Sequence, residues 1–182
     1  MRAFIAVSLP SALKARLTQI QNDLKGCDIA CKWVNPENIH ITLKFLGEIK
    51  DERLESIKKI ISTVGAKFKS LQVTFNNFGF FPNPKRPRVL FIGTSKEEEL
   101  RTISGVLEDK LETIGFKKEF KFRSHLTLAR IKDSKNIDCL INKLNTIKLE
   151  EEFIASAITL YKSTLTKSGP IYEVIFKSNL TA

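Results

Sequence analysis

The sequence predicts a fold of mixed strands and helices in which one unit occurs twice, giving two pseudo-symmetric lobes. The tetrapeptides that begin at His40 and His125, HITL and HLTL, are nearly identical. A β-prone apolar segment precedes each of them, and 37 positions separate Ala3 from His40 while 36 separate Val89 from His125. Both intervals contain an amphipathic helical pattern. Because two units are too few for a stacked solenoid, the repeat indicates an internal duplication.

In the first unit, residues 2–8 are apolar and β-prone and predict a strand. The chain after Pro10 predicts a helix that stops at Gly26, since apolar residues recur there at helical spacing. These residues are Leu13, Leu17, Ile20 and Leu24. Residues 40–45 alternate between polar and apolar and predict a strand, and residues 51–64 return to helical spacing. The order is strand, helix, motif strand, helix.

In the second unit, residues 71–81 and 88–95 predict a β-hairpin, because the turn-rich sequence PNPKRP joins them. An amphipathic helix is predicted from Ser95 to Gly115. The remaining elements are predicted as an extended segment over 118–131, a helix over 137–147, and strands over 153–161 and 171–176.

The chain length of 182 residues and the 42% hydrophobic content fit one domain built from two fused lobes, which we take to be residues 1–182. No run of 18 apolar residues is present, and the N-terminal apolar stretch is too short for a secretory signal. We therefore expect a cytoplasmic protein with no membrane segment and no obligate protein partner.

The formal net charge of +10 indicates an anionic partner, because clustered lysines and arginines attract phosphate backbones. Composition alone does not separate this interpretation from a lysine-rich surface that serves solubility.

Three cysteines, Cys27, Cys31 and Cys139, form no Cys-x-x-Cys pair, and we expect them to be reduced thiols. A zinc site on Cys27 and Cys31 would need two further ligands. The two histidines have another explanation, so we expect no metal and no cofactor.

Both histidines of the chain belong to the repeated motif. In a strand, alternation places His40 and Thr42 on one face and Ile41, Leu43 and Phe45 on the other. The same alternation places His125 beside Thr127 and buries Leu126 and Leu128. If the lobes are related by pseudo-symmetry, the two polar pairs converge on one site.

This arrangement suits the opening of a 2',3'-cyclic phosphate. The reaction needs a base that takes a proton from water and an acid that protonates the departing ribose oxygen, and imidazole serves both tasks near neutral pH. The hydroxyls of Thr42 and Thr127 can donate hydrogen bonds to the non-bridging phosphate oxygens.

Over nearly its whole length the chain resembles the two-histidine (2H) phosphoesterases, in the RNA 2',3'-cyclic phosphodiesterase branch formerly called 2'-5' RNA ligases. The resemblance is carried by five segments: MRAFIAVSLP, Trp33 through NIHITLKFLGEI, FNNFGFFPNPKRPRVLFIG, FRSHLTLARI and LYKSTLTKSGPIYEVI. It implies a bilobal α+β fold with two antiparallel sheets lining a central groove and helices outside. It also implies hydrolysis to a 2'-phosphate, with RNA ends, tRNA fragments among them, as substrates.

The resemblance further implies that His40 is the proton donor and His125 the proton acceptor. Arg130 is similar to the arginine that this family places near the phosphate, although strict alternation from His125 turns it away unless the strand ends or bulges near Ala129. Lys44, on the His40 face by alternation, is a rival substrate-binding cation.

Two alternatives remain open at this level. A 2'-5' RNA ligase acting on tRNA half-molecules would use the same residues. A non-catalytic RNA- or nucleotide-binding module would not need two acid-base groups, which the intact motifs supply.

Overall fold

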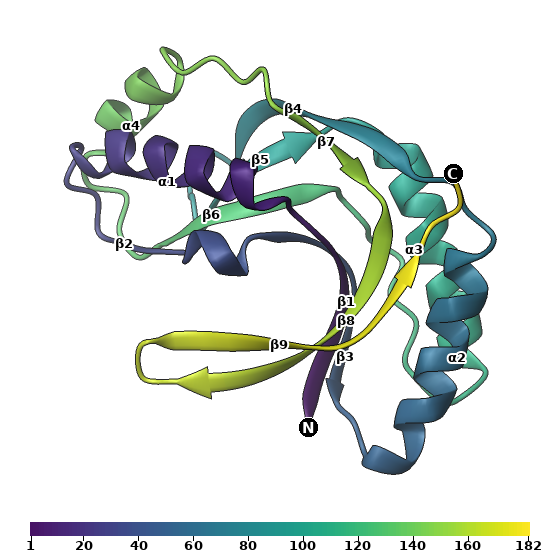
Figure 1. Ribbon diagram of the computed structural model, residues 1–182. Coiled ribbons are helices and arrows are strands. Elements are labelled where there is room, and N and C mark those ends of the chain that lie inside the picture. The colour runs from purple at the N-terminus through teal and green to yellow at the C-terminus, as the bar shows by residue number, and fades with distance from the viewer.

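Nine strands and four α-helices make up the computed structural model, which describes all 182 residues (Figure 1). The strands are β1 (Arg2–Ser8), β2 (Cys31–Trp33), β3 (His40–Glu48), β4 (Leu71–Phe81), β5 (Val89–Thr94), β6 (His125–Ile131), β7 (Glu152–Ala155), β8 (Ala157–Thr166) and β9 (Gly169–Asn179). The helices are α1 (Ser11–Lys25), α2 (Leu54–Gly65), α3 (Glu97–Glu112) and α4 (Ile137–Leu144), with short 3-10 helices η1 (Pro36–Asn38) and η2 (Asp51–Arg53). None of the helices has the length and apolar character needed to cross a membrane.

The strands form two antiparallel sheets that repeat one order. The four-stranded sheet runs β3-β1-β8-β9 and the five-stranded sheet runs β2-β6-β5-β4-β7. The strands β6, β5, β4 and β7 thus match β3, β1, β8 and β9, and β2 is an added edge. The predicted α+β duplication with two antiparallel sheets is confirmed. The lobes interleave, however, because β4 completes the second sheet while β8 and β9, from the end of the chain, complete the first.

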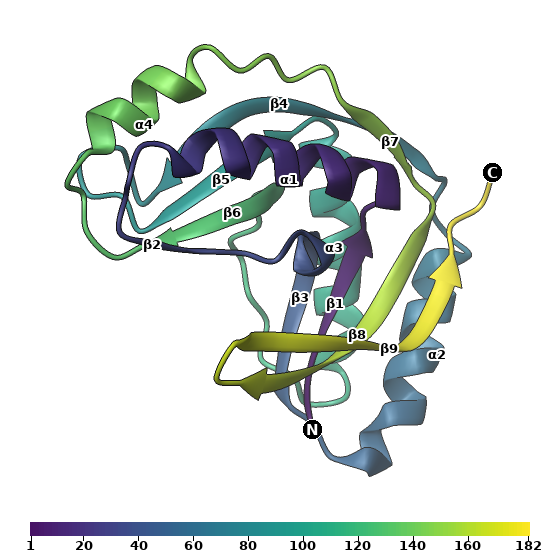
Figure 2. The same cartoon turned by 60° about the vertical axis from the view of Figure 1, so that its left-hand side comes forward.

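The helices cover the two sheets in pairs, and each pair includes a helix that follows a strand of the other sheet. Helices α1 and α4 lie side by side on the five-stranded sheet, and α2 and α3 lie side by side on the four-stranded sheet (Figures 1 and 2). The amide of Gln21 in α1 donates to the carbonyl of Leu128 in β6 at 3.0 Å, and the hydroxyl of Ser104 in α3 donates to the carbonyl of Leu43 in β3 at 2.7 Å. Helices α1 and α3 therefore each pack on the sheet opposite to the strand that precedes them.

Each motif strand carries a β-bulge at its motif leucine. The partners of Thr42 and Lys44 are adjacent residues of β1, so Leu43 is the extra residue of β3. The pairing of β6 with β5 shifts in the same way at Leu128. These are the two leucines whose carbonyls accept from the helices. A bulge moves the alternation by one residue, so side chains beyond it lie on the face opposite to the one that strict alternation gives.

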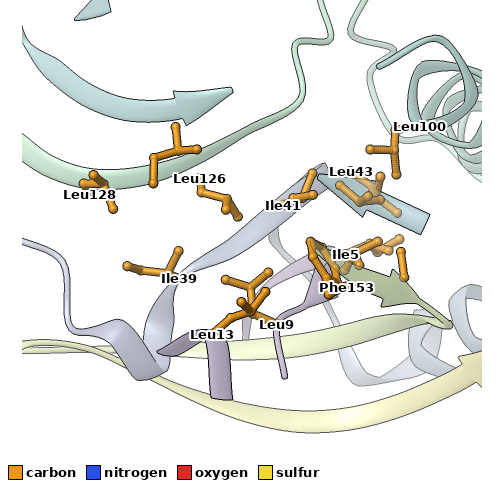
Figure 3. Close-up of a cluster of buried hydrophobic side chains, with 14 of the residues drawn as sticks. Ile5, Leu9, Leu13, Ile39, Ile41, Leu43, Leu100, Leu126, Leu128 and Phe153 are labelled. Carbon is orange, nitrogen blue, oxygen red and sulfur yellow. The ribbon is translucent and has the colours of Figure 1, made fainter. Parts of the chain in front are cut away.

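The apolar residues of both motifs enter one hydrophobic core, where they meet residues of the covering helices (Figure 3). Ile41, Leu126 and Leu128 are fully buried, and Leu43 is nearly so. The histidines and threonines of the motifs are only half-buried on the opposite face. Up to each bulge, the alternation that the sequence predicts is therefore present.

The structure differs from the predicted elements in three places. The three-residue strand β2 was not predicted, because so short a segment has no detectable periodicity. Residues 118–124 form no regular structure, and the strand begins only at His125. The segment 153–161 is two strands, since the chain passes from the five-stranded to the four-stranded sheet at Ser156.

The expectation of three reduced thiols is wrong, because Cys27 and Cys139 form a disulfide. It joins the segment after α1 to helix α4, across a sequence separation of 112 residues. Only the packing of α1 against α4 brings the two thiols together. Cys31 remains a free, half-buried thiol.

Candidate active site

The two histidines are oriented in the same way, each at the first residue of its motif strand. The Nδ1 of His40 lies 2.7 Å from the carbonyl oxygen of Asn38, and the Nδ1 of His125 lies 2.8 Å from the carbonyl oxygen of Arg123. Because a carbonyl oxygen only accepts, Nδ1 carries the hydrogen in both rings. Both Nε2 atoms are thereby left to accept or donate a proton.

Aromatic rings surround His40. Its ring stacks on Phe4 at 4.7 Å between centroids and meets the edge of Tyr172 at 5.5 Å, with Tyr161 at 6.4 Å. The pKa of His40 is lowered to about 4: burial is the main cause, the hydrogen bond to Asn38 opposes it, and the positive charge of His125 adds to it. Strands β3 and β6, which begin at the two histidines, contact each other.

Two phenylalanines and two arginines surround His125. The rings of Phe81 and Phe91 present their faces or edges to it at 5.0 and 5.7 Å. Burial lowers the pKa of His125, the hydrogen bond to the Arg123 carbonyl raises it, and the charges of Arg123 and Arg130 lower it. This imidazole is therefore held neutral by cations as well as by its apolar surroundings.

The motif threonines lie on the same face as the histidines. Thr42 is opposite Ala6 of β1 and Thr127 is opposite Phe91 of β5, and both threonines are half-buried. Two residues separate each threonine from its histidine, so the hydroxyl and the imidazole leave the strand on one side. Each sheet thus presents one histidine and one threonine on a single face, His40 with Thr42 and His125 with Thr127.

The bulges decide which later residues belong to this face. Arg130 is exposed on the face of His125, because the bulge at Leu128 shifts the alternation and Ala129 is buried instead. Burial lowers the pKa of His125 and raises that of Tyr172, and the charge of Arg130 acts to lower both.

The placement predicted for Lys44 and Phe45 is wrong. The bulge at Leu43 turns Lys44 into the core, where 2% of its side chain is exposed and its ammonium pairs with Glu108 at 2.8 Å. Phe45 lies instead on the face of His40, opposite Phe4, and is 59% exposed. Lys44 is thus removed from the substrate-binding candidates.

The residues that sequence reasoning missed are those that come from other strands. Arg123 lies over the rings of Phe81 and Phe91, with its guanidinium carbon 5.3 and 5.2 Å from their centroids. Tyr161 and Tyr172 come from the C-terminal hairpin, which the sequence did not place beside β1 and β3. The one available signal for Arg123 was its position, two residues before the second motif.

The site contains no obvious metal centre, since no three His, Cys, Asp or Glu side chains converge anywhere in the chain. A hollow of about 400 Å³ between the end of β3 and the start of α2 lies apart from the histidines and is lined by residues such as Glu48, Arg53 and Phe116.

Duplicated strands that each present one histidine and one threonine, on two sheets of repeated order, define a two-histidine protein with a duplicated α+β fold. The chain belongs to the LigT-like phosphoesterase family, whose family model matches residues 7–91 and again residues 92–172. The two matches correspond to the internal duplication.

Curated relatives share this family over almost their full length. The RNA 2',3'-cyclic phosphodiesterase of Methanocaldococcus jannaschii is 38% identical over 177 residues, which cover 96% of this chain and 98% of the relative. The protein of the same name from Archaeoglobus fulgidus is 35% identical over 174 residues, covering 95% and 97%.

Solved structures have the same fold. The crystal structure of TT0787 from Thermus thermophilus superposes with a TM-score of 0.83 at 26% identity, covering 99% of this chain and 98% of that one. Escherichia coli LigT complexed with 3'-AMP gives a TM-score of 0.80 at 21% identity, covering 100% and 98%, which supports the fold alone.

Proposed function

We propose that the protein is an RNA 2',3'-cyclic phosphodiesterase that hydrolyses a terminal 2',3'-cyclic phosphate to a 2'-phosphate. The observation that carries this proposal is the pair of imidazoles whose Nδ1 atoms are fixed by backbone carbonyls, so that both Nε2 atoms are free for proton transfer. The relatives named for this activity, 38% and 35% identical, support the choice of substrate.

The proposed reaction is an attack of water on the cyclic phosphorus. One imidazole takes a proton from the water as the new phosphorus–oxygen bond forms, and the other gives a proton to O3' as the phosphorus–O3' bond breaks. The products are a 2'-phosphate and a 3'-hydroxyl, and the imidazoles have exchanged their protonation states. No metal or cofactor takes part in this sequence.

We assign His40 as the proton donor and His125 as the proton acceptor. Burial, together with the charges of Arg123 and Arg130, lowers the pKa of His125, which favours the neutral state that a base needs. The pKa of His40 is lowered to about 4, chiefly by burial and also by the charge of His125. A bound phosphate anion raises that pKa by its opposite charge and so favours the protonated donor.

The remaining groups of the site would hold the phosphate. Thr42 and Thr127 are placed to donate hydroxyl hydrogen bonds to the non-bridging oxygens. Arg130 supplies a charge-assisted bond to the same oxygens, since it shares the face of His125. These donors stabilise the charge that accumulates on phosphorus-bound oxygen in the transition state.

The proposed partner is RNA with a 2',3'-cyclic phosphate end, tRNA fragments included, and the net charge of +10 suits such a polyanion. We propose that the enzyme meets such RNA in the cytoplasm. We propose that residues 1–182 form one catalytic domain. The two histidines come from different sheets, and neither half of the chain supplies all the strands of either sheet.

The test uses purified protein and a short RNA that ends in a 2',3'-cyclic phosphate. Phosphorus NMR of the product distinguishes a 2'-phosphate, which we expect, from a 3'-phosphate, which would reverse the assignment of the broken bond. The absence of turnover with a folded protein would contradict the proposal.

The same experiment separates the alternatives when a second RNA with a free 5'-hydroxyl is added. A product with a 2'-5' linkage would indicate a ligase, in which that hydroxyl replaces water. Tight binding of the RNA with neither product would indicate a binding module.

A further inference from the structure

The two halves of the site have equal motifs but different surroundings. Phe45 and Arg130 occupy equivalent positions, each the sixth residue of a strand that begins at the motif histidine, and both strands have the same burial pattern. Both side chains are exposed on the histidine face of their sheet. One half of the site therefore ends in an aromatic ring and the other in a cation.

The histidine face of the four-stranded sheet is largely apolar beyond Phe45, with Arg2 of β1 as an exposed cation on it. Register places Val174 opposite Tyr161 and Leu165 opposite Pro170, all on the face that carries Phe4 and His40. Val174 is 61% exposed and Leu165 is 65% exposed. Tyr172, half-buried on the same face, meets both Phe4 and His40. An exposed apolar surface thus continues directly from the His40 imidazole.

The histidine face of the five-stranded sheet carries exposed cations beside Phe81 and Phe91, the two rings that contact His125. Lys32 of β2 lies opposite Arg130 and is exposed, so the two cations leave the sheet side by side. The Lys32 ammonium is 3.8 Å from the point where a Cβ on Gly169 would lie, which places it at the tip of the β8–β9 hairpin of the other sheet. Arg123 adds a third cation beside His125.

We infer that these two faces orient an RNA end, with nucleobases stacked on the apolar surface around Phe45 and backbone phosphates held by Lys32 and Arg130. The inference rests on the proposed function. A base has a flat apolar face and its backbone carries a charge at every residue, so a site with one aromatic side and one cationic side matches single-stranded RNA in one orientation.

Phe45 is the residue that we assign to stacking. The Phe4 ring lies between His40 and Phe45, at 4.7 Å from the first and 6.3 Å from the second. A terminal base lies one ribose away from the reacting phosphorus, a separation comparable to the one that the Phe4 ring leaves between His40 and Phe45. A side chain that is 59% exposed also leaves its ring free to accept a base.

The experiment compares two RNA trinucleotides that end in a 2',3'-cyclic phosphate, identical except that one terminal ribose carries adenine and the other carries no base. For Phe45→Ala we expect the KM of the adenine substrate to rise about 5- to 100-fold, as loss of one base–aromatic stack does. The KM of the abasic substrate should not change, and Phe45→Trp should restore the wild-type value.

A matched control is Ile171→Ala, because Ile171 is 55% exposed on the opposite face of the same sheet, where it pairs with Thr164. This variant should leave both substrates unaffected. Lys32→Ala should raise the KM of the trinucleotide but not that of a 2',3'-cyclic mononucleotide, which has no upstream phosphate.

An equal rise in KM for both trinucleotides in Phe45→Ala would overturn the inference. It would also be overturned if Ile171→Ala raised the KM of the adenine substrate as much as Phe45→Ala does. A Phe45-dependent dimer in sedimentation would overturn it too, because the apolar surface would then bind a second copy. Equilibrium binding of the 2'-phosphorylated RNA, with and without its terminal base, reports stacking independently of turnover. An inactive wild-type protein would thus contradict the proposed function, whereas base-independent binding by the wild-type protein would contradict the stacking.

Discussion

Lys44, which the sequence predicted as a substrate-binding cation, forms a buried ion pair with Glu108 in the structure. Substitutions of this pair test whether Lys44 stabilises the fold instead of binding substrate. The two side chains are 2% and 5% exposed, and their charged atoms are 2.8 Å apart. Lys44 also donates to the Lys117 carbonyl at 2.7 Å, and Glu108 accepts from the backbone N–H of Glu119 at 3.0 Å. The pair therefore ties β3 and α3 to the segment that leads to the second motif.

Replacing one partner leaves a buried charge without compensation. We expect Lys44→Met to lower the free energy of unfolding by about 3–5 kcal/mol, a large part of the stability of an ordinary domain. In the double variant with Glu108→Leu, two backbone groups lose partners but no unpaired charge remains, so the loss should fall to about 2 kcal/mol.

The assay is urea denaturation followed by circular dichroism. With a slope of about 2 kcal/mol per molar urea, the single variant should lower the midpoint by about 2 M. Lys58→Met is the control, because Lys58 pairs with Glu55 at the surface and should contribute less than about 1 kcal/mol. A Lys44→Met protein of wild-type stability with a raised KM would refute the structural role and restore the phosphate-binding one.

Three further predictions concern the histidines. His40→Ala and His125→Ala should each lower kcat at least ~100-fold, and the double variant should fall little further, since the two act as a unit; a folded single variant with wild-type kcat would exclude the mechanism. Because the pKa of His40 is lowered from 6.5 to about 4, the unfolded chain binds the additional proton, so stability should decrease by at most about 3 kcal/mol as the pH falls from about 6.5 to 4. Urea denaturation at several pH values across this range should show that the free energy of unfolding changes less with pH in His40→Ala than in the wild type. An unchanged dependence on pH would contradict the lowered pKa. Turnover should survive EDTA, since both histidines serve proton transfer; activity that is lost in EDTA and restored by zinc or manganese would show that a metal takes part.

The sequence by itself determined the duplication, the main helices and strands, and the two motifs with their histidines and threonines. These follow from local periodicity, which a strand or helix expresses wherever it is placed. The repetition of one tetrapeptide at matched spacing added the link between the two halves, which the repeated sheet order confirms.

Only the tertiary structure decided which residues after each motif reach the site. Lys44 and Phe45 exchange faces because a bulge at Leu43 inserts one residue opposite β1, and Arg130 reaches its face through the same shift at Leu128. The pairing of Cys27 with Cys139 and the arrival of Tyr172 beside His40 likewise join segments far apart in the chain. Register, bulges and contacts across sheets depend on partners that no local pattern encodes, which is why the chemistry of the site was readable from the sequence while its surroundings were not.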